Sequence, residues 1–238
     1  MMKKSEKYKE LFTEEYLMGP NCMVLLEEML EYCPLKENSV VLDLGCGTGL
    51  TSFYLAKEAN VKVFATDLWI QPTENARRIE KWGLTERMIP IYADANALPY
   101  AKEYFDALVS VDAYHYFGTI HGFFEEKILP FLKKNGVAII AVPGIKKELR
   151  GELAETFFEW VGKDQKEYDS FRTVQWWREL LDGKEEYTVE TSLEMNCCEQ
   201  AWDEWFATAH PYAANDKIYY EKGMKEQLCF VGLVIRKK

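Results

Sequence analysis

The sequence lacks the features of a membrane or secreted protein. No apolar run in its 238 residues approaches the roughly 20 residues that a helix needs to cross a bilayer. The N-terminal stretch MMKKSEKYKE is charged and has no apolar segment behind it, so we expect no signal peptide. These absences predict a cytoplasmic protein that has no membrane partner.

Positive charge and metal-ligand patterns are also scarce. The chain has 29 Lys and Arg against 39 Asp and Glu, and its net charge of -10 is the wrong sign for a surface that neutralises phosphates. The six cysteines form no CxxC pair, and His115, His121 and His210 lack ligand spacing. We therefore expect no nucleic-acid partner, no disulfide framework and no metal site.

A short stretch that is rich in glycine organises the rest of the chain. Residues 40–49, VVLDLGCGTG, join an apolar run typical of a buried parallel strand to a turn with glycine at positions 45, 47 and 49. Residues 50–56 then have the pattern of a helix. These glycines follow GxGxG, whereas the dinucleotide fingerprint GxGxxG requires glycine at position 50, where the chain has Leu50.

This stretch resembles motif I of the class I S-adenosylmethionine-dependent methyltransferases, in which an acid precedes GxGxG. Asp43 is the acid here and stands where it could face an amino or ammonium group. In that family, a second acid ends the next strand and binds the ribose hydroxyls; residues 61–68, VKVFATDL, supply such a strand and Asp67 ends it. A tight turn and a helix cap are the alternative for the glycines and Asp67.

A third segment, residues 91–100 with the sequence IYADANALPY, is similar to the adenine-binding segment of the same family. There, an acid after the third strand accepts a hydrogen bond from the adenine amino group, and the next backbone N–H reaches the ring. The resemblance implies S-adenosyl-L-methionine as cofactor and S-adenosyl-L-homocysteine as product. The implied cofactor-binding residues are Asp43, Gly45, Cys46, Gly47, Gly49, Asp67, Leu68, Asp94, Ala95 and Asp112.

Strands and helices alternate from Ser39 onward, which is typical of a doubly wound α/β protein. The predicted strands are 39–45, 61–67, 88–93, 105–111 and 136–142, and the predicted helices lie near 49–59, 73–82 and 121–133. Two N-terminal helices, 6–17 and 21–33, precede them. The stripe of Tyr8, Phe12 and Tyr16 on the first is compatible with a lid over the site or with docking on the core.

The C-terminal part is expected to complete the sheet. We predict two helices within 151–182, a strand at 186–196, a short helix at 202–209 and a strand at 228–235. The resemblance implies a Rossmann-like, mostly parallel seven-stranded sheet of order 3-2-1-4-5-7-6 with the last strand antiparallel. We expect one domain, 1–238, made of an N-terminal helical cap (1–36), a cofactor-binding core (37–145) and C-terminal helices and strands (146–238).

Methyl transfer from a sulfonium is an in-line displacement that requires alignment and exclusion of water. A base is needed only if the acceptor carries a proton. His115, in the segment DAYHYFG after the fourth strand, is the candidate base, and Asp112 and Tyr114 are its rivals. A histidine that only packs at the strand end is an equally good explanation.

Seven tryptophans and fourteen tyrosines favour a small apolar or aromatic methyl acceptor. The same rings are compatible with a core or with a homo-oligomer interface. Two other functions stay open: a non-catalytic adenosylmethionine-binding protein, and a nicotinamide-dependent oxidoreductase, against which Leu50 and Asp43 count.

Overall fold

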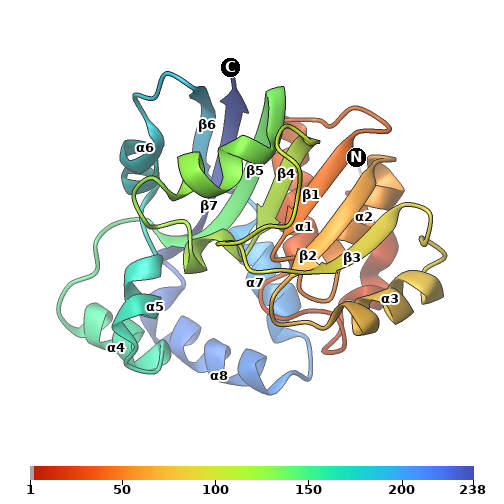
Figure 1. Cartoon of the computed structure of the whole chain (residues 1–238). Helices are drawn as coiled ribbons and strands as arrows, with labels where there is room; N and C mark the ends of the chain where they lie inside the picture. Colours follow the sequence, from red (N-terminus) through yellow and green to blue (C-terminus); the bar gives the residue numbers. More distant parts are fainter. Residues whose placement is uncertain (1–2) are drawn as a thin grey trace.

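The fold is built on a twisted sheet that carries helices on both faces (Figure 1). The computed structural model describes residues 3–238. The strands are β1 (Val40–Leu44), β2 (Lys62–Asp67), β3 (Met88–Tyr92), β4 (Phe105–Val111), β5 (Leu132–Ile145), β6 (Tyr187–Glu194) and β7 (Leu228–Lys237). Their order is β3-β2-β1-β4-β5-β7-β6, and β7 runs antiparallel to both β5 and β6 while the pairs among β1 to β5 are parallel. The predicted fold class is confirmed.

The helices cover a sheet whose alternate residues face two separate cores. The helices are α1 (Cys22–Tyr32), α2 (Leu50–Glu58), α3 (Pro72–Lys81), α4 (Glu152–Trp160), α5 (Gln165–Ser170), α6 (Val174–Leu181), α7 (Cys198–Phe206) and α8 (Pro211–Tyr219). In β1, Val41 packs into the core that includes α1, α2 and α7, whereas Leu42 packs into the core that includes α6. None of the helices formed by residues 3–238 is long and apolar enough to span a membrane.

The carboxyl ends of the parallel strands meet at one edge of the sheet, where α/β proteins bind ligands. Figure 1 shows α4, α5 and α8 beyond this edge, below the sheet in the view. The C-terminal helices α4, α5 and α8 therefore lie on the same side of the sheet as the loops that follow β1, β2, β3 and β4.

The helix predicted at 121–133 does not form. A single π-helical turn (Phe124–Ile128) and a 3-10 turn (Leu129–Phe131) occupy its place, and β5 begins at Leu132. Pro130 has no N–H to continue a helix. The chain turns again at Asn135, whose φ of 63° is left-handed, and pairing with β4 shifts register there before resuming at Val137.

The C-terminal helices are more numerous than predicted. Residues 151–182 form three helices because Asp164 and Thr173 each accept backbone N–H bonds and begin a new one, α5 and α6. The single helix predicted at 202–209 corresponds to α7, which begins earlier, at Cys198. A second helix, α8, lies beyond the predicted range because His210 and Pro211 begin it after α7 has ended.

In the N-terminal stripe, Tyr8 packs on the core, whereas Tyr16 lines the cavity described below. Residues Ser5–Leu11 form a short 3-10 helix rather than part of an α-helix over 6–17. The Tyr8 ring packs edge-on against Phe53 with ring centres 5.0 Å apart, and its hydroxyl donates to Glu58 at 2.6 Å. This segment is docked on α2, which argues against a lid that includes Tyr8.

Two neighbouring carboxylates on α1 fasten distant segments to the core. Glu27 accepts hydrogen bonds from the backbone N–H groups of Lys4 and Ser5 and from the Ser5 hydroxyl. Glu28 accepts from the backbone N–H groups of Asn196 and Cys197 at 2.8 and 2.7 Å. Both glutamates are buried, so their bonds to these donors are shielded from water.

We expect Glu27→Ala to lower the free energy of unfolding by about 2 to 4 kcal/mol, because it leaves buried donors without an acceptor. Urea denaturation measures this loss. Glu31→Ala, an exposed glutamate on the same helix, is the control and should change the value by less than about 0.5 kcal/mol. Equal effects of the two substitutions would show that Glu27 does not fasten the N-terminal segment.

Candidate active site

Two positions in the glycine turn after β1 have backbone conformations that favour glycine. Gly45 has a φ of +75°, and a Cβ there would lie 2.3 Å from the Cβ of Ala113. Gly47 has a φ of +53°, and a Cβ would lie 2.9 Å from the Met18 sulfur. The backbone is therefore exposed to whatever occupies the space above the turn. Gly49 has a different role, because it is the N-cap residue that precedes α2.

Asp67, at the end of β2, ties two loops together. One carboxylate oxygen, Oδ2, accepts the backbone N–H of Gly47 at 2.8 Å. The other, Oδ1, accepts the backbone N–H groups of Trp69 and Ile70 at 2.7 and 2.8 Å. The side chain thus caps the loop after its own strand, and it also fixes the glycine turn of the neighbouring strand.

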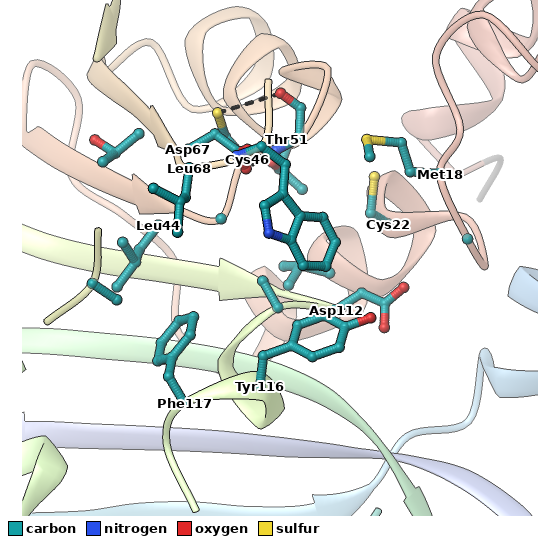
Figure 2. A pocket seen from close by; sticks show the side chains of 18 of the residues that line it. Met18, Cys22, Leu44, Cys46, Thr51, Asp67, Leu68, Asp112, Tyr116 and Phe117 are labelled. Atoms are coloured by element: carbon teal, nitrogen blue, oxygen red, sulfur yellow. Dashed lines mark hydrogen bonds between the residues drawn. The ribbon is translucent and has the colours of Figure 1, made fainter. Parts of the chain in front are cut away.

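A cavity of about 370 Å³ opens over this turn, within the size range of small-molecule sites. Its lining includes all the predicted cofactor-binding residues except Asp43 and Gly49. Figure 2 shows Asp67, Leu68 and Cys46 on one wall and Asp112 across the cavity from them. At the adjacent strand end, Asp94 accepts the backbone and side-chain N–H groups of Asn96, which lower its pKa, and the next lining residue, Ala95, is buried.

Asp43 does not reach the cavity, so the expected direct contact with an amino group is not supported. Its side chain is fully buried beneath the turn, where Oδ2 accepts the hydroxyls of Thr51 and Ser52, both at 2.6 Å. Burial raises the pKa of Asp43 to about 6, although these two hydroxyls oppose the rise. Asp43 thus joins β1 to the first turn of α2.

His115 and Tyr114 also lie outside the cavity lining. The His115 ring is 2% exposed and packs against Tyr116 and Phe171, and burial lowers its pKa to about 3. Tyr114 is fully buried in the core beside Trp177. The structure therefore gives no support to either residue as the base, because neither side chain reaches the space where an acceptor would bind.

Of the three candidates for the base, the structure brings Asp112 to the cavity. It follows β4 in a left-handed conformation with a φ of 55°, which Asp tolerates better than most residues. Burial raises the pKa of Asp112 to about 8, and the charges of Glu167 and Asp216 add to the rise. A carboxyl group with such a pKa can exchange a proton near neutral pH.

Several lining residues were not predicted. Met18 and Cys22 come from the segment before and at the start of α1, and Lys166 comes from α5. Trp69, in the loop after Asp67, is 64% exposed and lies with its ring centre 5.2 Å from that of Tyr116. A tryptophan two residues after a predicted ligand-binding acid was the available signal, whereas nothing in the sequence placed Lys166 here.

Part of the chain is similar to methyltransferases. Residues 41–136 match the family model described as "Methyltransferase domain". This segment contains the glycine turn, Asp67, Asp94 and Asp112. It therefore includes most of the cavity-lining residues that belong to the motifs of the resemblance. The resemblance to methyltransferases is confirmed.

Relatives with known names share this part of the chain. Methyltransferase GfsG of Streptomyces halstedii is 31% identical over 90 residues, which are 37% of this chain and 32% of that protein. The arginine-hydroxylase NDUFAF5 of Homo sapiens, a mitochondrial protein, is 36% identical over 124 residues, which are 49% of this chain and 33% of that protein. The chain thus spans about a third of the length of these two relatives.

Solved structures show that the likeness in fold extends over nearly the whole chain. Phosphoethanolamine N-methyltransferase 2 of Haemonchus contortus, in complex with S-adenosyl-L-methionine, superposes with a TM-score of 0.70 at 18% identity. The superposition covers 93% of this chain and 54% of that one. At this identity, the similarity concerns the fold.

The buried Asp43 predicts a particular dependence of stability on pH. Its folded pKa of about 6 exceeds its ordinary value of 3.8, so the folded state binds the proton more tightly, and the stability gained from that proton is lost as the pH rises through about 6. We expect Asp43→Asn to remove this dependence. The difference in free energy of unfolding, wild type minus Asp43→Asn, should fall by up to about 3 kcal/mol between pH 4 and pH 7.5. A difference that stays constant in urea titrations at both pH values would contradict the assignment.

Proposed function

We propose that this protein is an S-adenosylmethionine-dependent methyltransferase that acts on a small molecule. The observation that carries the proposal is the bond between Asp67 and the N–H of Gly47, which joins an acid and a glycine turn from neighbouring strands at the rim of one cavity. The methyltransferase match over residues 41–136 supports the reaction class. The named relatives include a hydroxylase as well as a methyltransferase, so the reaction has to be tested directly.

The residues of the cavity fit the cofactor. Gly45 and Gly47 line the cavity and carry no side chain, so the backbone there leaves room for a close approach by the methionine part. Asp67 already uses both acceptor positions of Oδ1 and one of Oδ2, which leaves room for one ribose hydroxyl at Oδ2. In this proposal, Asp94 accepts a hydrogen bond from the adenine amino group, and the backbone N–H of Ala95 donates one to the adenine ring. When bound, the cofactor supplies an electrophilic methyl group.

The geometry disfavours a nicotinamide dinucleotide. A pyrophosphate needs free backbone N–H groups at the glycine turn, but the N–H of Gly47 is donated to Asp67. Leu50 takes the place of the third fingerprint glycine and is 1% exposed in the core. The Asp67 carboxylate at this turn would also repel the phosphates.

The extent of the cavity favours an enzyme over a binding protein. The cavity continues beyond the cofactor residues to a half lined by Met18, Cys22, Tyr116 and Lys166, which we propose as the acceptor half. In this proposal, the segment before β1 and the helices after β5 close the acceptor half, while residues 37–145 hold the cofactor. The side chains of Trp69, Tyr116 and Phe117 would contact an apolar or aromatic part of the acceptor.

The purified protein should bind S-adenosylmethionine and S-adenosylhomocysteine and should show no binding of NAD or NADP in isothermal titration calorimetry. Incubation with S-adenosylmethionine and a metabolite mixture should yield a product heavier by one methyl group in mass spectrometry. Binding of nicotinamide cofactors alone would refute the proposal, and cofactor binding without any methylated product would favour a non-catalytic protein.

Asp67→Ala should weaken S-adenosylhomocysteine binding about tenfold to a hundredfold, because a charge-assisted hydrogen bond and the anchor of the glycine turn are lost. Calorimetry gives the affinity, and circular dichroism checks that the variant is folded. Glu86→Ala, an exposed glutamate before β3, should bind like the wild type. An unchanged affinity in folded Asp67→Ala would show that Asp67 is only a cap.

A further inference from the structure

The acceptor half of the cavity carries a carboxylate that lacks a protein partner. Asp112 Oδ2 lies on the wall formed by the segment before α1, 2.7 Å from the position that a Cβ on Gly19 would take. Within residues 3–238, its side chain forms no hydrogen bond or ion pair, and it lines the cavity. Tyr116, which Figure 2 shows extending toward the same part of the cavity, also has no hydrogen-bond partner for its hydroxyl among these residues.

The neighbouring charges increase the negative potential around Asp112. Asp216, on α8, accepts the indole N–H groups of Trp160 and Trp205 at 2.8 and 2.9 Å, and these neutral donors leave its charge unbalanced. Glu167, on α5, is half-buried and forms no ion pair within residues 3–238. Both residues act on Asp112, because their charges raise its pKa.

The rest of the lining offers little compensation for this charge. Among the described lining residues, Lys166 is the one cationic side chain, and it is exposed. The rings of Trp69 and Tyr116 lie 5.2 Å apart at an angle of 57° and border the same cavity. Aromatic faces attract cations. An anionic acceptor would meet unfavourable charge here, whereas a cationic one would meet a carboxylate between aromatic rings.

We propose that the methyl acceptor is an amine, that it enters the cavity as an ammonium ion, and that Asp112 holds this ion and then takes its proton. This inference rests on the proposed function and specifies its substrate class and its base. The chain's net charge of -10 would also draw a cation toward the protein.

The proton transfer balances as follows for a primary amine. The ammonium ion gives one N–H proton to Asp112 and becomes a neutral amine whose nitrogen carries a lone pair. That lone pair forms the bond to the methyl carbon while the carbon–sulfur bond breaks and its electrons remain on sulfur. The product is a secondary ammonium ion, and the proton on Asp112 passes to solvent when the next ammonium ion binds, so each turnover yields one proton.

Ammonium binding should also displace a proton from the empty site. Near pH 7, the Asp112 carboxyl, with its pKa of about 8, is largely protonated before the ion arrives. The groups around it are Glu167 and Lys166 on α5, Asp216 on α8, Cys22 on α1, and the neighbouring His115 and Tyr116. His115 is neutral at this pH and does not supply the proton, because burial lowers its pKa to about 3.

The test uses the full chain saturated with S-adenosylhomocysteine. Calorimetry would measure the binding of benzylamine and 2-phenylethylamine against the matched alcohols and carboxylates. We expect the amines to bind at least tenfold more tightly than the alcohols, and the carboxylates to bind most weakly. In buffers of different ionisation enthalpy at pH 7, amine binding should release close to one proton.

Asp112→Asn is the decisive variant because asparagine also tolerates the left-handed conformation, so the fold should survive. It should weaken amine binding at least tenfold, abolish the proton release, and change the affinities for alcohols and S-adenosylhomocysteine by less than about twofold. Asp203→Asn removes the same charge from an exposed site on α7 and should bind all probes like the wild type.

Three results would overturn the inference while leaving the proposed function intact: no amine binding to the loaded protein, alcohols or carboxylates that bind more tightly than amines, or an equal loss of S-adenosylhomocysteine affinity in Asp112→Asn. The last result would assign Asp112 to the amino group of the cofactor itself. Failure of the wild type to bind S-adenosylhomocysteine would instead refute the proposed function.

Discussion

The site depends on the three hydrogen bonds that the Asp67 carboxylate accepts from backbone N–H groups. Two of the donors belong to the loop after β2 and one to the loop after β1, so a single ionised side chain sets the relative position of both loops. Charge-assisted bonds of this kind are stronger than bonds between neutral groups. The glycines allow the β1 loop its shape, but Asp67 selects one shape from those that glycine permits.

The sheet could be predicted well because its sequence pattern, apolar strand segments between helical segments, is local and recurs along the chain. Apolar strands separated by helical patterns indicated the positions of β1 to β4, and the strand order followed from the resemblance. The errors lie where local pattern and chain geometry compete. The apolar residues of 121–133 resemble a helical face, but Pro130 and the left-handed Asn135 divert the chain into turns and an early β5.

The part of the cavity wall that follows the strand ends could be predicted, but the part that we propose binds the acceptor could not. Residues that follow parallel strands meet at one edge whatever their side chains, so Asp67, Asp94 and Asp112 were predictable. In the turn after β4, three successive side chains diverge, and only packing decides that Tyr116 enters the cavity while His115 is buried. Lys166 lines the cavity because of the tertiary packing of α5, which no sequence motif predicts.

The position of β7 in the sheet has a consequence for folding during synthesis on the ribosome. Within residues 3–238, β6 pairs with β7 alone, and β7 also completes the pairing of β5. Because the chain emerges from its N-terminus, β6 and one edge of β5 have no backbone hydrogen-bond partner until the residues from Leu228 onward are synthesised. During this interval, the apolar edge of β5 has unpaired backbone groups, a state that favours association with other chains. Synthesis of β7 then closes this edge of the sheet.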